Sequence, residues 1–131
     1  MRFNLFLACL FCIFFFSVHV SGREHVLVRD TSEKKKAQYG VASYYSDKFI
    51  GKKTANGEIF SQEKLTAAHN SLPLGTYIKV TNLRNHKSVK VKINDRLHRR
   101  NKRLVDLSKA AARKLGFMRS GITRVKVQVI E

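Results

Sequence analysis

Three titratable side chains stand where short apolar segments give way to turns. Asp95 follows an alternating apolar segment, Glu58 follows an Asn-Gly turn signal, and His69 comes after two small residues. Such positions lie at the rim of a β-sheet, where a cleft can form beside rigid backbone. A carboxylate held there can give a proton to a bound substrate or take one from it. The pattern therefore makes Asp95 the first candidate for general acid–base chemistry.

Each of these residues also has a purely structural interpretation. Asp95 could cap a turn or pair with Arg96 or Arg99, because paired carboxylates are often only structural. A single histidine after an apolar stretch, such as His69, is more often a satisfied core or turn residue than a catalyst. Glu58 could be an exposed acid that faces the neighbouring lysines. The residue types alone leave both interpretations open.

The segments that must position these residues have the pattern of β-strands. Apolar side chains alternate with charged or polar ones at a period of two, which is typical of strands with one buried face. The three clearest segments are residues 77–81, 88–93 and 124–129, and residues 41–45 add a fourth. Residues 84–87 predict a hairpin turn, in which Asn85 is able to take the left-handed conformation.

One helix is predicted near the C-terminal end of the chain. Ser108 can cap its start, and Gly116 can end it. Leu107, Ala111 and Leu115 share one apolar stripe at helical spacing. Several short strands with one short helix, and no βαβ alternation, indicate a mainly β fold and fit a small closed barrel.

Residues 1–22 have the features of a secretory signal peptide. They carry one charge, Arg2, followed by an apolar run too short for a comfortable membrane span and then by small residues. An uncleaved N-terminal anchor is the alternative interpretation.

Both cysteines, Cys9 and Cys12, lie inside this N-terminal segment. We therefore expect no disulfide bond in the mature protein, and we expect no lipid anchor because neither cysteine has a suitable context. Residues 23–37 are polar and charged, which predicts a flexible leader before a single domain over residues 38–131.

The chain is strongly basic, with a formal net charge of +17 that falls only to +16 without Arg2. Such a charge attracts polyanions, among them anionic wall polymers, phospholipid head groups and nucleic acid. The signal peptide argues against nucleic acid as the natural partner, so we expect no nucleic-acid partner. A solubilising surface is the alternative explanation of the charge.

No cofactor is expected from the sequence. His86 and His98 have no acid or cysteine at ligand spacing, so no metal site is predicted. The chain has no glycine-rich phosphate loop, and no serine stands in the context of a nucleophile.

Three polar segments, in their order along the chain, resemble the rare lipoprotein A (RlpA-like) family of bacterial cell-envelope proteins. They are Thr54-Ala55-Asn56-Gly57-Glu58, Leu65-Thr66-Ala67-Ala68-His69 and Val91-Lys92-Ile93-Asn94-Asp95-Arg96. The resemblance implies a small six-stranded double-psi β-barrel with one or two short helices. Composition and periodicity do not supply this topology.

The resemblance also implies an activity and a site. Family members act as endolytic peptidoglycan lytic transglycosylases, which cut the β-1,4 bond between MurNAc and GlcNAc of peptide-stripped strands and leave a 1,6-anhydro end. It implies Asp95 as the general acid and base, with Glu58 and His69 tuning its pKa and holding the sugar. The substrate-binding candidates are Tyr44, Thr54, Asn56, Asn94 and Arg96. From the residue types alone, Tyr44, Tyr45 and Phe49 could offer flat faces to a sugar ring, although aromatic side chains in a small barrel are usually core. Tyr44 and Tyr45 should point to opposite sides of one strand, so we expect at most one of them to face a ligand.

The chain departs from the family pattern after Arg96. Active members typically continue with a glycine-proline turn, whereas residues 97–103 here form a charged segment. A displaced groove wall could cost about a hundredfold in rate. A non-catalytic, expansin-like wall-binding module therefore stays open as an alternative, with binding that weakens with salt and depends on Arg99 and Arg100. A secreted binder of nucleic acid or membrane surfaces is a third interpretation.

The expected partners and location follow from the interpretation as a lytic transglycosylase. The substrate would be peptidoglycan glycan strands, other anionic wall polymers would be further partners, and the protein would be a monomer. It would be secreted across the inner membrane into the periplasm or cell envelope.

Overall fold

A computed structural model describes residues 36–130, so the interpretations of residues 1–35 lie outside the described residues. The strands are β1 (Gln38–Tyr44), β2 (Thr66–His69), β3 (Tyr77–Asn82), β4 (Ser88–Arg96), β5 (Val105–Leu107) and β6 (Ile122–Val129). The helices are the 3₁₀ helix η1 (Asp47–Phe49) and the α-helix α1 (Lys109–Leu115). Within the described residues, no helix is long and apolar enough to cross a membrane.

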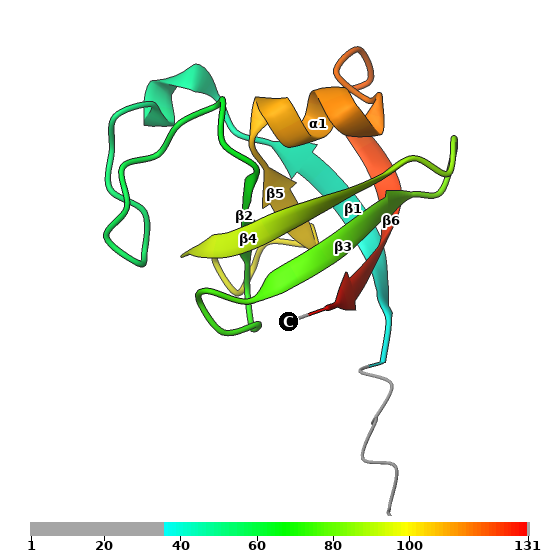
Figure 1. Ribbon diagram of the computed structural model, residues 1–131, viewed down its shortest axis with the longest axis horizontal. Helices are drawn as coiled ribbons and strands as arrows, with labels where there is room; N and C mark the ends of the chain where they lie inside the picture. The colour runs from blue at the N-terminus through cyan, green and yellow to red at the C-terminus, as the bar shows by residue number, and fades with distance from the viewer. Residues whose placement is uncertain (1–35, 131) are drawn as a thin grey trace, which may run out of the picture. The chain divides into compact units, whose positions relative to one another are not determined.

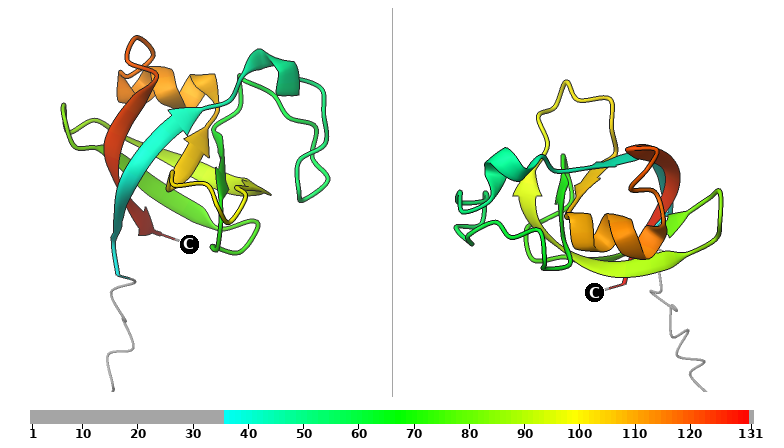
Figure 2. Two further views of the ribbon diagram at one scale, coloured as in Figure 1. Left: turned by 180° about the vertical axis from the view of Figure 1, so that it is seen from behind. Right: turned by 90° about the horizontal axis from the view of Figure 1, so that it is seen from above.

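The six strands close into a barrel in the order β1-β5-β2-β4-β3-β6 (Figures 1 and 2). The pairs β1–β5 and β2–β4 are parallel, and the other four pairs are antiparallel. The mainly β, six-stranded barrel expected from the sequence is therefore confirmed. Closure leaves no unpaired sheet edge along the barrel wall.

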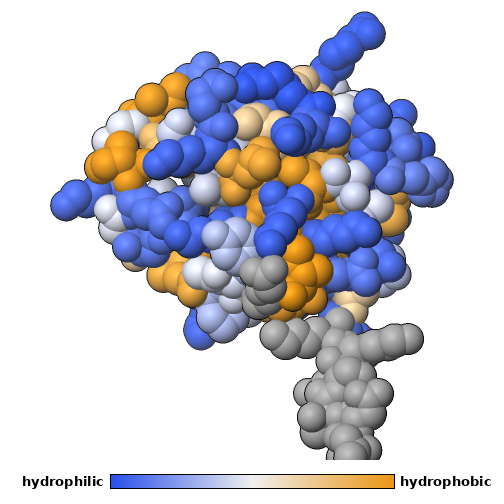
Figure 3. All heavy atoms as spheres, viewed as in Figure 1, coloured by the Kyte–Doolittle hydropathy of each residue, from blue (hydrophilic) through white to orange (hydrophobic). Residues whose placement is uncertain are grey.

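The alternating segments form the long strands as predicted, because one face of each meets the barrel interior. Ile78 and Val80 of β3 and Val91 and Ile93 of β4 are almost fully buried, while the lysines between them are not. The outer face seen in Figure 3 is mostly covered by hydrophilic side chains, with apolar ones between them. This separation of buried apolar and exposed polar side chains is typical of a sheet with one solvent-exposed face.

The predicted helix is present over α1, with one difference in detail. Ser108 caps it by accepting a hydrogen bond from the Ala111 N–H at 3.3 Å, and Gly116 ends it in the left-handed conformation. Leu107 belongs to β5 and not to the helix, although its side chain is buried as expected. In the hairpin between β3 and β4 the left-handed residue is His86, with φ of 62°, and not Asn85.

The short strands β2 and β5 were not predicted, because their patterns do not alternate. Every residue of both strands is buried, since the outer face of each is covered as well as the inner one. They lie next to each other in the barrel, with β5 also beside β1 and β2 also beside β4. As a result, the ends of β1, β4 and β5 come together at one side of the barrel.

Candidate functional site

Asp95 lies near the end of β4, and its carboxylate accepts three hydrogen bonds. The Tyr45 hydroxyl donates to Oδ2 at 2.6 Å. The backbone N–H groups of Ala55 and Arg96 each donate to Oδ1 at 2.9 Å. Hydrogen bonds to an ionised acceptor are the strong ones, so these donors fix the orientation of a half-buried carboxylate. All three donors are neutral groups.

Glu58 accepts three hydrogen bonds from side chains. Lys92 Nζ donates at 2.5 Å and Asn56 Nδ2 at 2.8 Å to Oε1, while Asn94 Nδ2 donates to Oε2 at 3.2 Å. These bonds, that of Lys92 first, lower the pKa of Glu58 from 4.5 to about 2. Such a group stays ionised at neutral pH, which suits it to holding its partners in place and not to donating a proton.

The network of Glu58 ties residues 54–58 to β4. The Thr54 hydroxyl donates to Asn56 Oδ1 at 2.7 Å, and the Asn56 N–H donates to the Asn94 carbonyl at 3.1 Å. This docking is what presents the Ala55 N–H to Asp95. Glu58 is therefore linked to Asp95 through the backbone of its own loop and not by a direct contact.

His69 is fully buried, and both of its ring nitrogens are bonded. Nδ1 accepts from the N–H groups of Ser71 and Leu72 at 3.1 Å each, so the proton lies on Nε2, which is 2.9 Å from Gln38 Oε1. Burial, followed by the charge of Arg96, lowers the pKa of His69. The ring is thus a neutral side chain that holds the turn after β2.

The strand register sets His69 apart from Asp95. In the parallel β2–β4 pair, Ala68 lies opposite Asp95 and His69 lies opposite Arg96. Side chains opposite each other share a face and successive ones alternate, so His69 points to the other face of the sheet from Asp95. Direct contact between this imidazole and the Asp95 carboxylate, which the resemblance led us to expect, is absent from the described hydrogen bonds.

A cavity of about 460 Å³ opens over Asp95. Its lining includes three of the residues predicted from the sequence, Tyr44, Asp95 and Arg96. It also includes residues that the sequence interpretation did not assign to the site, chiefly Ser43, Tyr45, Arg103 and Asp106. The other predicted residues lie in the Glu58 network or, for His69, on the opposite face.

Asp106 is a second carboxylate in this cavity. It accepts from the Ser43 hydroxyl at 2.6 Å and from Arg103 Nε and Nη2 at 2.7 and 2.8 Å. The two-point contact with Arg103 neutralises its charge, and the same contact raises the pKa of Arg103. The signal for this residue was a single acid inside the otherwise apolar triplet Val105–Leu107.

Tyr45, and not Tyr44, is the tyrosine whose hydroxyl reaches Asp95. Burial, then the bond to Asp95, raises the pKa of Tyr45 well above its ordinary value, so the hydroxyl keeps its proton and remains a donor. The Tyr44 hydroxyl donates to the Met118 carbonyl at 3.0 Å, and its ring contacts Phe117. Both tyrosines line the cavity, so the contact of Tyr44 with a sugar stays a prediction, and the sequence did not indicate the bond between Tyr45 and Asp95.

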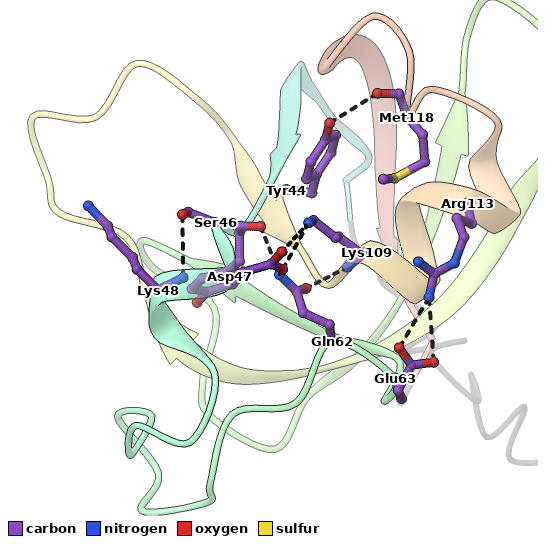
Figure 4. A network of polar contacts seen from close by, with 10 residues as sticks. Tyr44, Ser46, Asp47, Lys48, Gln62, Glu63, Lys109, Arg113 and Met118 are labelled. Atoms are coloured by element: carbon purple, nitrogen blue, oxygen red, sulfur yellow. Dashed lines mark hydrogen bonds and ion pairs between the residues drawn. The ribbon is translucent and has the colours of Figure 1, made fainter.

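A polar network holds the segment after β1 against α1 (Figure 4). Gln62 Nε2 donates to the Tyr45 carbonyl at 2.9 Å, and Gln62 Oε1 accepts from the Lys109 N–H at 2.8 Å. Lys109 Nζ also lies 2.8 Å from the Asp47 carboxylate, and this bond is the main cause of the lowered pKa of Asp47. The network fixes the backbone of Tyr45, and so the reach of its hydroxyl.

Arg96 lines the cavity but is anchored behind it. Its Nη1 donates to the Leu72 carbonyl at 2.5 Å and to the His69 carbonyl at 3.3 Å. Within residues 36–130 there is no group of histidine, cysteine or acidic side chains that could hold a metal ion.

The barrel and its aspartate-lined cavity define a class of protein. Residues 37–127 match the family model described as lytic transglycolase, and the chain belongs to this family of double-psi β-barrels.

Curated relatives in this family are named endolytic peptidoglycan transglycosylase RlpA. The protein of Pasteurella multocida is 50% identical over 95 residues, which are 72% of this chain and 32% of the relative. That of Pseudomonas aeruginosa (strain UCBPP-PA14) is 52% identical over 92 residues, which are 70% of this chain and 27% of the relative. That of Neisseria meningitidis serogroup B is 42% identical over 114 residues, or 87% and 47% of the two chains. This chain thus spans less than half the length of these relatives.

Solved structures share the fold at low sequence identity. A Streptomyces papain inhibitor superposes with a TM-score of 0.60 at 20% identity, covering 73% of this chain and 96% of the inhibitor. An expansin of Clavibacter michiganensis, in complex with cellohexaose, gives a TM-score of 0.57 at 21% identity, covering 73% of this chain and 51% of the expansin. At this identity the likeness supports the fold alone.

Proposed function

We propose that this protein is an endolytic peptidoglycan lytic transglycosylase with Asp95 as its general acid and base. The observation that carries the proposal is the Asp95 carboxylate, which faces a cavity and is oriented by neutral donors only. The oxygens of Asp106 in the same cavity are instead engaged by the Ser43 hydroxyl and, at two points, by the Arg103 guanidinium. The names of the relatives support peptidoglycan as the substrate.

The reaction needs one proton carrier used twice. Protonated Asp95 gives its proton to the oxygen between MurNAc C1 and GlcNAc as that bond breaks, and GlcNAc leaves with a new hydroxyl. The carboxylate then takes the proton of the MurNAc C6 hydroxyl as its oxygen bonds to C1. The products are a 1,6-anhydro end and a regenerated acid, with no water consumed.

The other predicted residues act around this step. Glu58 positions residues 54–58, with Thr54, Asn56 and Asn94 as its partners, and so keeps the Ala55 N–H on Asp95. His69 supports the backbone after β2, next to the strand that carries Asp95. Tyr44 and Arg96 are proposed to contact the sugar where they line the cavity.

Location and partners follow from the substrate. Peptidoglycan lies in the cell envelope, so we infer secretion across the inner membrane to the periplasm or envelope. The strongly basic chain would also attract other anionic wall polymers there. We propose that the protein works as a monomer.

The test compares the purified chain with its Asp95→Asn variant on peptidoglycan stripped of stem peptides. Mass spectrometry of the products should show 1,6-anhydro ends from the wild type, and at least about a hundredfold fewer from the variant. The matched control is Glu63→Gln, an exposed acid that lies 3.4 Å from Arg113 and should leave the rate unchanged. Equal product from Asp95→Asn would overturn the assignment. Absence of product from both proteins, when both bind the strands, would favour a non-catalytic wall-binding module.

A further inference from the structure

The segment between β4 and β5, residues 97–103, is the basic loop. It carries Arg99, Arg100, Lys102 and Arg103 together with His98, and it contains no acid. It stands clear of the barrel wall, as the right-hand view of Figure 2 shows. Its first residues also line the cavity over Asp95.

Both ends of the basic loop are anchored to the barrel. Arg96, just before it, donates to the Leu72 carbonyl at 2.5 Å. Arg103, its last residue, holds the Asp106 carboxylate at two points, and the following Leu104 N–H donates to the Val41 carbonyl at 2.8 Å. The cations at the two ends are thus used by the fold itself.

The middle of the basic loop is braced by its own hydrogen bonds. The Asn101 N–H donates to the His98 carbonyl at 2.8 Å, and Asn101 Oδ1 accepts from the Arg103 N–H at 3.0 Å. The Arg100 N–H also donates to His98 Nδ1, at 3.2 Å. The loop is therefore a built turn that presents its side chains in a defined place.

The cations at the middle of this turn have no partner among the described residues. Arg99, Arg100 and Lys102 are exposed, and no described hydrogen bond or ion pair involves their side chains. Arg99 and Arg100 line a second cavity, of about 840 Å³, with Arg96, Leu97 and His98. The last three residues also line the cavity over Asp95, so the two cavities adjoin.

We propose that the basic loop binds carboxylate groups carried by the glycan strand that lies in the groove. A neutral sugar chain gives such a group of like charges nothing to pair with, whereas a guanidinium matches a carboxylate in charge and shape. This inference rests on the proposed function. Peptidoglycan offers carboxylates of two sources, the lactyl group of each muramic residue in stripped strands and the stem peptides in intact ones. The loop thus selects strands that bear free carboxylates next to the bond that is cut.

The test uses the wild-type chain, the double variant Arg99→Gln/Arg100→Gln, and a control double variant, Arg84→Gln/Arg119→Gln. The control removes the same charge from another cavity, which lies between the end of β3, the segment after α1 and the start of β6. Rates are measured on stripped strands and on the same strands with their lactyl carboxylates converted to methylamides. The wild type and the control should show a KM about fivefold higher on the amidated strands than on the stripped strands. The loop variant should show the higher KM on both substrates. In every case kcat should change less than about twofold.

A loop variant that still prefers the acidic strands as the wild type does would overturn the proposal. A preference seen only with peptide-bearing strands would support it with the stem peptides as the source of the carboxylates. Heparin, a general polyanion, serves as a competitor for binding to the strands. If heparin competes less well by the same factor in both double variants, and no protein prefers one kind of strand, the proposal is also overturned. Because sedimentation of each protein with the strands measures binding without turnover, the inference stays testable even if the wild type proves inactive and the proposed function fails.

Discussion

Two loops flank the end of β4, and they treat their polar side chains in opposite ways. In residues 54–58 the side chains of Thr54, Asn56 and Glu58 are bonded to one another or to β4. In the basic loop the end residue Arg103 is bonded, but the side chains of Arg99, Arg100 and Lys102 are exposed without a described partner. Residues 54–58 hold Asp95 in place, whereas the basic loop leaves exposed positive charge near the cavity over Asp95.

The contrast shows that a polar side chain near a cavity is not by itself a ligand for substrate. Glu58 stands in the segment that resembles the catalytic family, yet its carboxylate is engaged by three donors of the protein itself. Arg99 stands in the segment that was expected to depart from the family pattern, yet its side chain is exposed and has no described partner.

The largest loss of stability is expected from Asp106→Asn, because this change leaves Arg103 without its anion and unpins the basic loop. Breaking a buried pair is strongly destabilising, but 42% of the Arg103 side chain is exposed, so we expect a loss of about 2 kcal/mol. Urea unfolding measures it. Ser43→Ala removes only the hydroxyl donor and should cost about 1 kcal/mol. Equal losses of stability in the two variants would show that the ion pair between Arg103 and Asp106 contributes no more than a single hydrogen bond.

Glu58→Gln should lower the rate about tenfold, since a weaker dock for residues 54–58 misplaces the Ala55 N–H. The pKa of Glu58 is about 2 in the folded protein against 4.5 ordinarily, so the unfolded chain binds more protons here as the pH falls. The stability contributed by Glu58 is therefore present above pH 4.5 and is lost between 4.5 and about 2. The variant should lack this part of the acid sensitivity in a series of unfolding curves. Unchanged acid sensitivity in Glu58→Gln would mean that the docking network does not stabilise the fold.

Tyr45→Phe should reduce the rate several-fold and the stability by about 1 kcal/mol, because it removes one neutral donor from Asp95. Tyr44→Phe is its matched control, since it also removes one hydroxyl donor, to the Met118 carbonyl. The two variants should unfold at similar urea concentrations, yet only Tyr45→Phe should change the pH profile of the rate. The same pH profile in both variants would show that the Tyr45 hydroxyl does not affect proton transfer by Asp95.

Much of the fold could be predicted from the sequence, since the buried faces of β3, β4 and β6 follow a period of two. The short strands β2 and β5 could not, because covered strands do not alternate. Asp95 was found by its place after an alternating segment. Asp106 was missed for the same reason as its strand, and the partners of His69 depend on Gln38, which no local pattern links to it.

The smallest effect on stability is expected from Arg99→Gln/Arg100→Gln. If the free charges serve a ligand and not the fold, their removal should leave the unfolding free energy within about 0.5 kcal/mol of the wild type, as for most exposed substitutions. Relief of repulsion among like charges would move it slightly upward, and added salt would then remove the difference. Urea unfolding at low and high salt checks both points. A loss as large as that of Asp106→Asn would instead place these arginines among the contacts that hold the barrel, and the two loops beside β4 would no longer differ.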